Sequence, residues 1–263
     1  MSGICFVAFC LISLGGIALA ASNKQPAPAG AFRGAPAQYT DFTTRELERG
    51  FFSLAFGSDL RIGAKPRGIR RFDHPIRIAV IAGGSVDRSA AMARVIDDYA
   101  AQVPSLQLSR VTTEGAPADI EVRLIDERSF KSALQAAFGA QVTATFIART
   151  NPQCMTSVKS AAEGEIVRSV SFIIVDKGDA VFLDCAYHEL LHAFGLSNHD
   201  QRNPWTTLNQ KRVVGYLTAY DRALLTILYN PQVKPGMTAA QADRALPGVI
   251  RDLGLVRAAP PPR

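Results

Sequence analysis

The sequence predicts an α+β fold: a mixed β-sheet, one helix that backs it, and a further helix that carries an HExxH motif. Three observations predict it. Strand-like patterns follow one another along the chain, one amphipathic helix pattern stands early among them, and a longer apolar helix pattern follows the last strand. Strands in succession with helices against them are typical of α+β domains. Because the sequence shows no internal repeat and its composition does not change between two parts of the chain, we expect one domain over residues 41–254.

The first half of this domain begins with a short helix near Thr43 that covers the core. Its apolar side chains are Leu47, Phe51, Phe52, Leu54 and Phe56. A strand is expected over Ile76–Ala82, then a helix over Asp87–Val103, then a strand near Leu106–Thr112. The apolar stripe of that second helix comprises Met92, Val95, Ile96, Tyr99 and Val103.

The second half opens with the clean apolar–polar alternation of Asp119–Ile125, which predicts a strand with one face toward the core. Val142–Ala148 and Ile166–Val175 are two more expected strands, and the motif helix should span Val181–Gly195.

After the motif, residues 203–211 are expected to form a loop. A capping box at Thr218–Asp221 should open a helix that runs through Tyr229 and ends at Asn230-Pro231. A last helix should start at Thr238, with Gln241 as its box partner, and break at Pro247.

The sequence predicts a cleaved segment at the start of the chain and flexible segments on either side of the domain. Residues 1–20 lack charged side chains, run apolar from Ile4 to Leu19 and end in a small-x-small pattern, which indicates a signal peptide. A retained membrane anchor is the alternative. Residues 21–40, rich in Ala, Pro and Gly, predict a flexible leader, and residues 255–263 a disordered tail. We therefore expect a periplasmic or extracellular protein.

Cleavage of the signal peptide would leave two cysteines, Cys154 and Cys185, in an exported chain. An exported pair predicts one disulfide, which would tie the first turn of the motif helix to a preceding segment. Ligation of a metal by Cys185 is the alternative, although a disulfide sulfur cannot bind as a thiolate.

The net charge of +6 is spread widely, with one basic cluster in a stretch broken by Gly and Pro. The cluster comprises Arg61, Lys65, Arg67, Arg70 and Arg71. We interpret it as a solvated loop, with contact to an anionic envelope surface or an acidic partner as the alternative. Aromatic residues do not interleave with these charges, so we expect no nucleic-acid binding.

Three of the four histidines lie close together in the sequence: two in the motif His188-Glu189-Leu190-Leu191-His192, which also supplies a carboxylate, and the third at His199. Residues four apart share one face of a helix, so His188 and His192 can bind one metal ion while Glu189 stands beside them. This pattern predicts a zinc hydrolase with Glu189 as the general base toward a zinc-activated water.

The third ligand is expected after Gly195, where a positive φ would turn the chain back toward the metal. The string H-E-x-x-H-x-x-G resembles the signature of the metzincin metallopeptidases, whose third histidine follows the glycine after two residues. In this chain that position holds Asn198. His199 is our preferred third ligand because imidazole suits zinc, and Asp200 is the alternative.

Other residues near the motif are secondary candidates. Asp184, one turn before His188, could orient its ring, and Tyr216 or Tyr220 could stabilise an oxyanion, although packing or solvation is the more common role of each. The metzincin resemblance implies a methionine turn soon after the third ligand, but residues 203–208 contain no methionine. The helix start at Leu217–Asp221 resembles the one that follows that turn, so the chain looks like a divergent relative with a zincin-like layout.

A closer resemblance covers residues 42–237, to a bacterial family of secreted domains of unknown function. Its pieces are Gly50-Phe51-Phe52, the two cysteines, the stretch Glu189–Asn198, and the ending Leu228–Pro231 with Lys234–Met237. Many members of that family carry Glu and Gln in place of the two motif histidines, so the resemblance alone does not imply catalysis.

We therefore predict a secreted zinc-dependent metallopeptidase that acts on a peptide or protein substrate, with Zn²⁺ held by His188, His192 and His199. Two alternatives are open. One is a non-catalytic binding or scaffold domain of the cell envelope that keeps the zincin-like fold. The other is an amidase of cell-wall peptides with the same metal chemistry.

Overall fold

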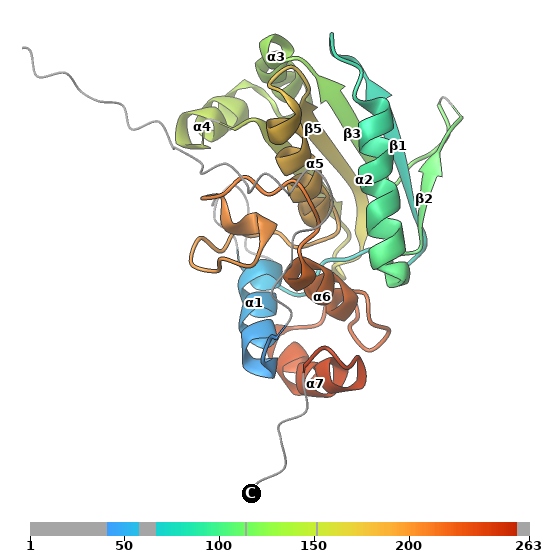
Figure 1. The fold of residues 1–263 in the computed structure, drawn as a ribbon, viewed down its shortest axis with the longest axis vertical. Helices are drawn as coiled ribbons and strands as arrows, with labels where there is room; N and C mark the ends of the chain where they lie inside the picture. Colours follow the sequence, from blue (N-terminus) through green and yellow to red (C-terminus); the bar gives the residue numbers. More distant parts are fainter. Residues whose placement is uncertain (1–40, 58–66, 114, 151, 257–263) are drawn as a thin grey trace, which may run out of the picture.

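The computed structural model describes residues 41–57, 67–113, 115–150 and 152–256 (Figure 1). The expected signal peptide, the leader and the tail from residue 257 lie outside these described residues. Within them the chain folds as a mixed α/β structure around one five-stranded sheet with the order β2-β1-β3-β5-β4. The predicted combination of a mixed sheet and helices is confirmed.

Four strands of the sheet are parallel and one is antiparallel. β1 (Ile76–Ala82) lies between β2 (Leu108–Val111) and β3 (Ile120–Ile125), and β3 pairs in turn with β5 (Ile166–Ile174). The edge strand β4 (Cys154–Ser160) runs antiparallel to β5. The parallel pairs need crossovers, and α2 (Ser89–Gln102) supplies the one between β1 and β2.

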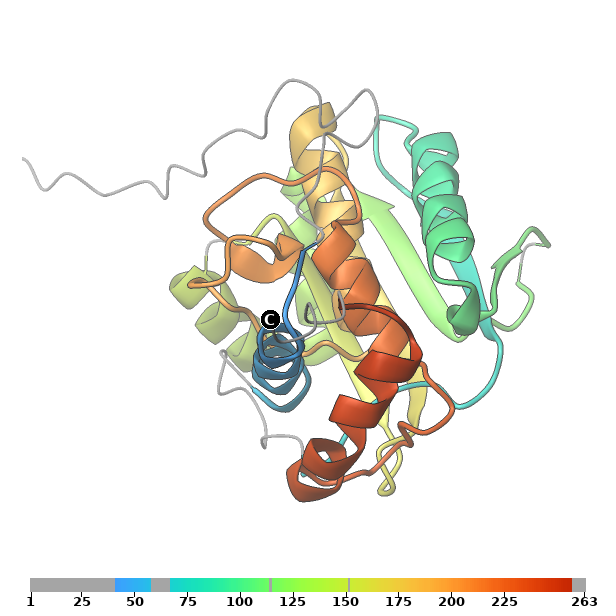
Figure 2. The same cartoon turned by 60° about the horizontal axis from the view of Figure 1, so that its bottom comes forward.

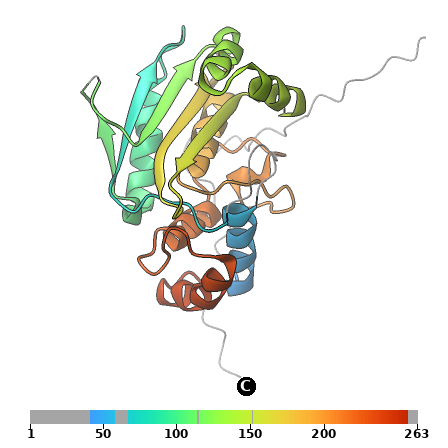
Figure 3. The ribbon, with the colours of Figure 1, turned by 180° about the vertical axis from the view of Figure 1, so that it is seen from behind.

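The two faces of the sheet carry different helices. On one face α5 (Asp179–Ala193) packs against β4 and β5 while α2 packs against β1 and β2, and Figure 3 shows the strands in front of both. The other face of β5 packs on α3 (Glu127–Phe138) and α4 (Ala140–Thr150). Alternation along β5 explains the division: Ile173 joins the core beneath α5, whereas Phe172 and Ile174 join the smaller core beneath α3 and α4.

A second layer of helices lies at one end of the sheet. α1 (Thr44–Phe56), from the start of the described chain, packs against α6 (Ala219–Leu228) and α7 (Ala239–Asp252), from its end (Figure 2). The predicted caps are present. Thr43 with Glu46 and Thr238 with Gln241 form full capping boxes, and Thr218 accepts from the Asp221 amide.

Two secondary-structure predictions were wrong. The expected strand Val142–Ala148 lies inside α4, where Thr143 and Phe146 are buried at helical spacing. A short apolar run fits a strand or a helix equally well, and here the contact with α3 decides. Pro247 does not break α7, which continues to Asp252 because Pro247 is exposed while Leu246, Val249 and Ile250 anchor the opposite face.

The basic cluster is not a fully solvated loop. Arg61 and Lys65 lie outside the described residues, and Arg67 is exposed. Arg71, by contrast, is buried, and its Nη1 donates to the carbonyl oxygens of Leu228, Asn230 and Val233 at 3.0, 3.2 and 2.9 Å. Arg71 therefore secures the turn after α6, because it donates to three backbone carbonyls there, two of them in buried contacts.

The predicted disulfide is confirmed. Cys154 and Cys185 are bonded, with their Cα atoms 5.8 Å apart. The bond joins the start of the edge strand β4 to the first half of α5, so the motif helix is covalently tied to the sheet on which it packs.

Candidate metal centre

The HExxH residues occupy the second half of α5, a helix that is buried on almost every side. His188 is 7% exposed and Glu189 is 3% exposed. The Oγ1 of Thr156 on β4 donates to the Glu189 carbonyl oxygen at 3.1 Å, and the Oγ of Ser169 on β5 donates to that of Ala193 at 3.0 Å. The sheet thus holds this part of α5 at two points, one of them next to His188.

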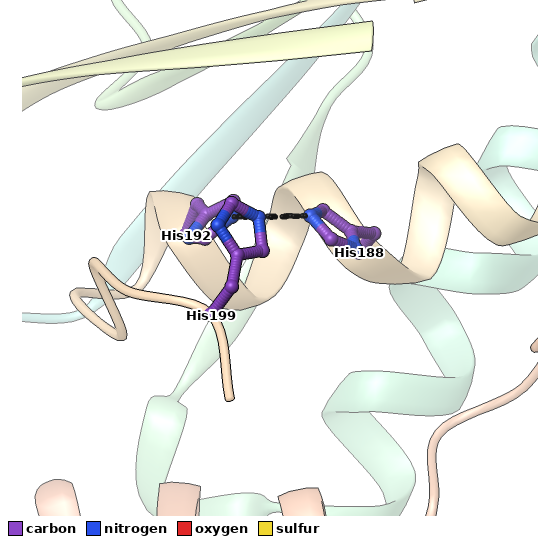
Figure 4. Close-up of side chains that lie close together, drawn as sticks. All are labelled: His188, His192 and His199. Atoms are coloured by element: carbon purple, nitrogen blue, oxygen red, sulfur yellow. Dashed lines mark hydrogen bonds between the residues drawn. The ribbon is translucent and has the colours of Figure 1, made fainter. Parts of the chain in front are cut away.

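Three imidazole nitrogens converge at the end of α5 (Figure 4). The Nε2 atom of His188 lies 3.0 Å from that of His199 and 3.1 Å from that of His192, and the third separation, His192 to His199, is 3.1 Å. Zinc–nitrogen bonds of about 2.0–2.1 Å at tetrahedral angles would set the ligand nitrogens about 3.3 Å apart. The three side chains therefore fit one zinc ion.

Backbone carbonyls fix the orientation of the two helix histidines. His192 Nδ1 lies 2.6 Å from the Leu196 carbonyl oxygen, and His188 Nδ1 lies 3.3 Å from that of Thr207. A carbonyl oxygen can only accept, so each Nδ1 carries the proton and each Nε2 keeps its lone pair for a metal. This arrangement of donors is the one that metal-binding histidines need.

The turn after α5 explains why His199 reaches the site while Asn198 does not. Gly195 has φ +115°, as the sequence predicted, and a Cβ there would lie 2.0 Å from the Arg70 carbonyl oxygen. Beyond it, the amides of Ser197 and Asn198 donate to the Leu54 carbonyl oxygen in the last turn of α1, and Asn198 Nδ2 donates to that of Ser53. Asn198 is thereby held toward α1, and the next side chain turns to the metal site.

The alternative third ligand, Asp200, makes contacts away from the three histidines. Its amide donates to the Leu208 carbonyl oxygen at 3.1 Å, and its Oδ1 accepts from the Arg202 amide at 3.1 Å. Among the described residues, the group of His, Cys, Asp and Glu side chains that could hold a metal consists of His188, His192 and His199.

The secondary candidates also have other contacts. Asp184 Oδ1 accepts from the Val214 amide at 2.7 Å, and the Tyr220 hydroxyl donates to the Glu46 carbonyl oxygen at 2.9 Å. Tyr216 lines a cavity between α2 and the first half of α5. The sulfur of Cys185 is in the disulfide, so it offers no thiolate to a metal.

Residues 44–248 match a family of proteins of unknown function, DUF2927. This chain belongs to that family. The match agrees with the resemblance to domains of unknown function, which covered nearly the same residues, but it shows no relationship to the metzincins. No curated protein and no solved structure matches the chain.

Sequence reasoning missed three residues of this DUF2927 chain that support the centre. Thr207 presents its carbonyl to His188, Gln210 places its Nε2 3.0 Å from His199 Nε2, and Asp221 holds the turn that carries both. The Asp221 carboxylate, fully buried at the start of α6, accepts from the Thr207 amide and from the hydroxyls of Thr206 and Thr218. These contacts are long-range, and the only local signal was the capping box at Thr218.

Proposed function

We propose that this DUF2927 chain is a zinc-dependent hydrolase of peptide bonds that acts in the periplasm or outside the cell. The observation that carries the proposal is the triangle of three Nε2 atoms, 3.0–3.1 Å on each side. Glu189 follows the first of these histidines directly, which is the spacing that a general base beside such a centre requires. The mixed sheet backed by α5 supports a zincin-like layout.

His188, His192 and His199 would hold the ion, and the two Nδ1 contacts keep the helix histidines aimed at it. Zinc held by three protein ligands supplies a Lewis acid that lowers the pKa of a water at its open position to about 7. Glu189 takes the proton of the attacking water and gives it to the leaving amine. In that sequence the water oxygen bonds to the carbonyl carbon, the carbon–nitrogen bond breaks, and acid and amine are released.

An extended peptide is the substrate conformation that the fold favours. β4 is the last strand in the sheet order, and it runs beside the motif helix, with Thr156 bonded to the Glu189 carbonyl oxygen. An edge strand can add an extended peptide through main-chain hydrogen bonds. A peptide paired to β4 in this way would pass the end of α5 near the three histidines.

The compartment is part of the proposal. The Cys154–Cys185 disulfide fits an oxidising environment, such as the periplasm or the cell exterior. Among the described residues, no helix has both the length and the apolar character to span a bilayer.

The test combines metal content with cleavage. The mature chain should hold about one zinc per molecule by elemental analysis, and it should cleave a denatured protein mixture. Glu189→Gln keeps the size of the side chain and should retain the zinc, yet cleavage should fall by at least about a hundredfold. Glu163→Gln, on an exposed loop, is the matched control and should leave both unchanged.

Each other outcome assigns a different function. Stoichiometric zinc with no cleavage that depends on Glu189 would support a non-catalytic envelope scaffold. Cleavage of purified peptidoglycan, but not of proteins, would identify an amidase of cell-wall peptides. A chain that binds no zinc and is insensitive to chelators would exclude the metal centre.

A further inference from the structure

The side chain of Gln210 lies at the metal centre without belonging to the predicted ligand set. Its Nε2 is 3.0 Å from His199 Nε2, which equals the shortest separation between the histidine nitrogens themselves. The HExxH helix and the turn after it supply the histidines, whereas Gln210 comes from the end of the Thr207–Asn209 turn. A fourth polar side chain therefore approaches His199, one of the three histidines, from a different segment.

This segment is fixed rather than loose. The Asp221 carboxylate accepts from the Thr207 amide at 2.8 Å, and Asn209 Nδ2 donates to the carbonyl oxygens of Gln201 and Asn203 at 3.3 and 2.6 Å. Thr207 also presents its carbonyl to His188. Gln210 is thus carried by the same turn that orients one of the ligands.

The backbone of Gln210 is strained. It has φ +61° and ψ −5°, in the left-handed region that favours glycine, and among the described non-glycine residues only Gln107 shares a positive φ. Strain of this kind persists where the surrounding structure imposes it, and it concentrates at functional sites. Glycine would adopt this backbone without strain, so the presence of glutamine indicates that its side chain has a function here.

The carboxamide can present either of its ends to the centre. Its Oε1 is 3.5 Å from Gln201 Nε2, a long contact on the exposed side that offers little resistance to rotation. A half turn about the last side-chain bond exchanges Oε1 for Nε2 without moving the backbone. The oxygen would then face the point that the three imidazoles share, as a neutral and weak zinc ligand.

We propose that Gln210 is a displaceable fourth ligand that closes the metal centre until substrate enters. The proposal rests on the metal centre of the proposed function. Four protein ligands are typical of a structural zinc site and three of a catalytic one. The centre is therefore closed when the Gln210 amide binds the metal and open when it does not. Because an amide binds zinc weakly, a substrate carbonyl can replace it, whereas a carboxylate at this position would hold the site shut.

Cobalt in place of zinc tests the proposal without any activity measurement. The mature chain is loaded with Co²⁺, whose visible absorption reports the ligand set, and titrated with azide, which needs an open position. If the closed form holds about nine-tenths of the molecules, Gln210→Ala should bind azide about tenfold more tightly than wild type. Gln210→Gly, which accepts the left-handed backbone, should behave in the same way even if the alanine variant folds poorly. Gln210→Glu should bind Co²⁺ more tightly and azide more weakly.

Lys211→Ala, at the exposed neighbouring position, is the control for disturbance of the turn and should match wild type. Identical cobalt spectra and azide titrations for wild type, Gln210→Ala and Gln210→Gly would overturn the role of Gln210 and leave the three-histidine centre intact. A wild-type chain that binds no Co²⁺ would overturn both the role of Gln210 and the proposed function.

Discussion

Three consecutive residues, Asn198, His199 and Asp200, stand where the sequence placed the third metal ligand. The choice among them depends on neighbours distant in the chain. Ser53 and Leu54 in α1 bind Asn198, and Leu208 binds the Asp200 backbone, which leaves His199 to face His188 and His192. The spacing in the sequence identified the two helix histidines, but these loop contacts could not be derived from it.

The same residues give a prediction about metal affinity. His199→Ala removes one of three nitrogen ligands and should weaken zinc binding by at least about a hundredfold. Asp200→Ala should change it less than about tenfold, because its carboxylate accepts from the Arg202 amide and does not belong to the group that could hold the metal. Competition with a chromophoric chelator measures both constants. A larger effect of Asp200→Ala than of His199→Ala would reverse the assignment.

The buried carboxyl group of Asp221 should make the stability of the fold depend on pH. Burial raises its pKa above 3.8, against the opposing effect of its hydrogen bonds from Thr206, Thr207 and Thr218. The folded state then holds the proton more tightly than the unfolded chain, so the stability that Asp221 contributes is full below pH 3.8 and falls as pH rises through the raised value. Asp221→Asn should destabilise the fold by about 1–3 kcal/mol, and more at about pH 4 than at pH 7.

Urea unfolding of both proteins at the two pH values measures this difference. Because Asp221 also fixes the turn that carries Thr207 and Gln210, zinc affinity should fall with stability. Asp243→Asn, at an exposed position of α7, is the matched control. A cost of Asp221→Asn that grows with pH would contradict the direction of the pKa shift.

Among the elements, α1 has a role that its amphipathic pattern did not predict. Its apolar face covers the core as expected, but the carbonyls of its last turn also anchor the loop before His199. Helix ends leave carbonyls without partners inside the helix, and here Ser197 and Asn198 satisfy them. The position of His199, the proposed third ligand, therefore depends on a helix about 140 residues earlier in the chain, as the Ser197–Gly57 contact illustrates.

Asn198→Ala tests this dependence. The variant loses the bond from Nδ2 to the Ser53 carbonyl oxygen and should cost about 1 kcal/mol of stability. Zinc affinity should fall by about tenfold, because the loop can then move His199 away from its partners. Asn230→Ala, in the turn after α6, offers a comparison with a similar stability cost and no effect on zinc. Unchanged affinity in Asn198→Ala would show that Gly195 and the backbone bonds to Leu54 suffice to set the loop.

The elements that the sequence predicted correctly are those with strong periodicity. The helices at Thr44–Phe56 and Ser89–Gln102 and the strands Ile76–Ala82 and Ile120–Ile125 agree with their patterns. β4 and α3 were not predicted. β4 is an edge strand whose residues are mostly half-buried and polar, and α3 buries only Phe130 and Leu134, so neither carries a broad apolar face.

For the whole molecule, the sequence predicted a mixed sheet with helices but not the order of its strands. That order depends on which strands meet after the crossovers. Of the described strands, only β4 and β5 follow each other without an intervening helix and also pair in the sheet, where they run antiparallel. The disulfide was predictable because the expected mature chain holds two cysteines. It fixes the relation between that edge strand and the motif helix.

Removal of the disulfide separates its structural role from any role in metal binding. The bond closes a loop with a sequence separation of 31 residues. A Cys154→Ala/Cys185→Ala variant should therefore lose about 3–4 kcal/mol of its free energy of unfolding on chain-entropy grounds. Its zinc affinity should stay within about tenfold of wild type, because α5 remains bound to the sheet through Thr156 and Ser169. Urea unfolding and chelator competition on the same samples measure both quantities, and a loss of zinc binding at unchanged stability would instead make Cys185 part of the metal centre.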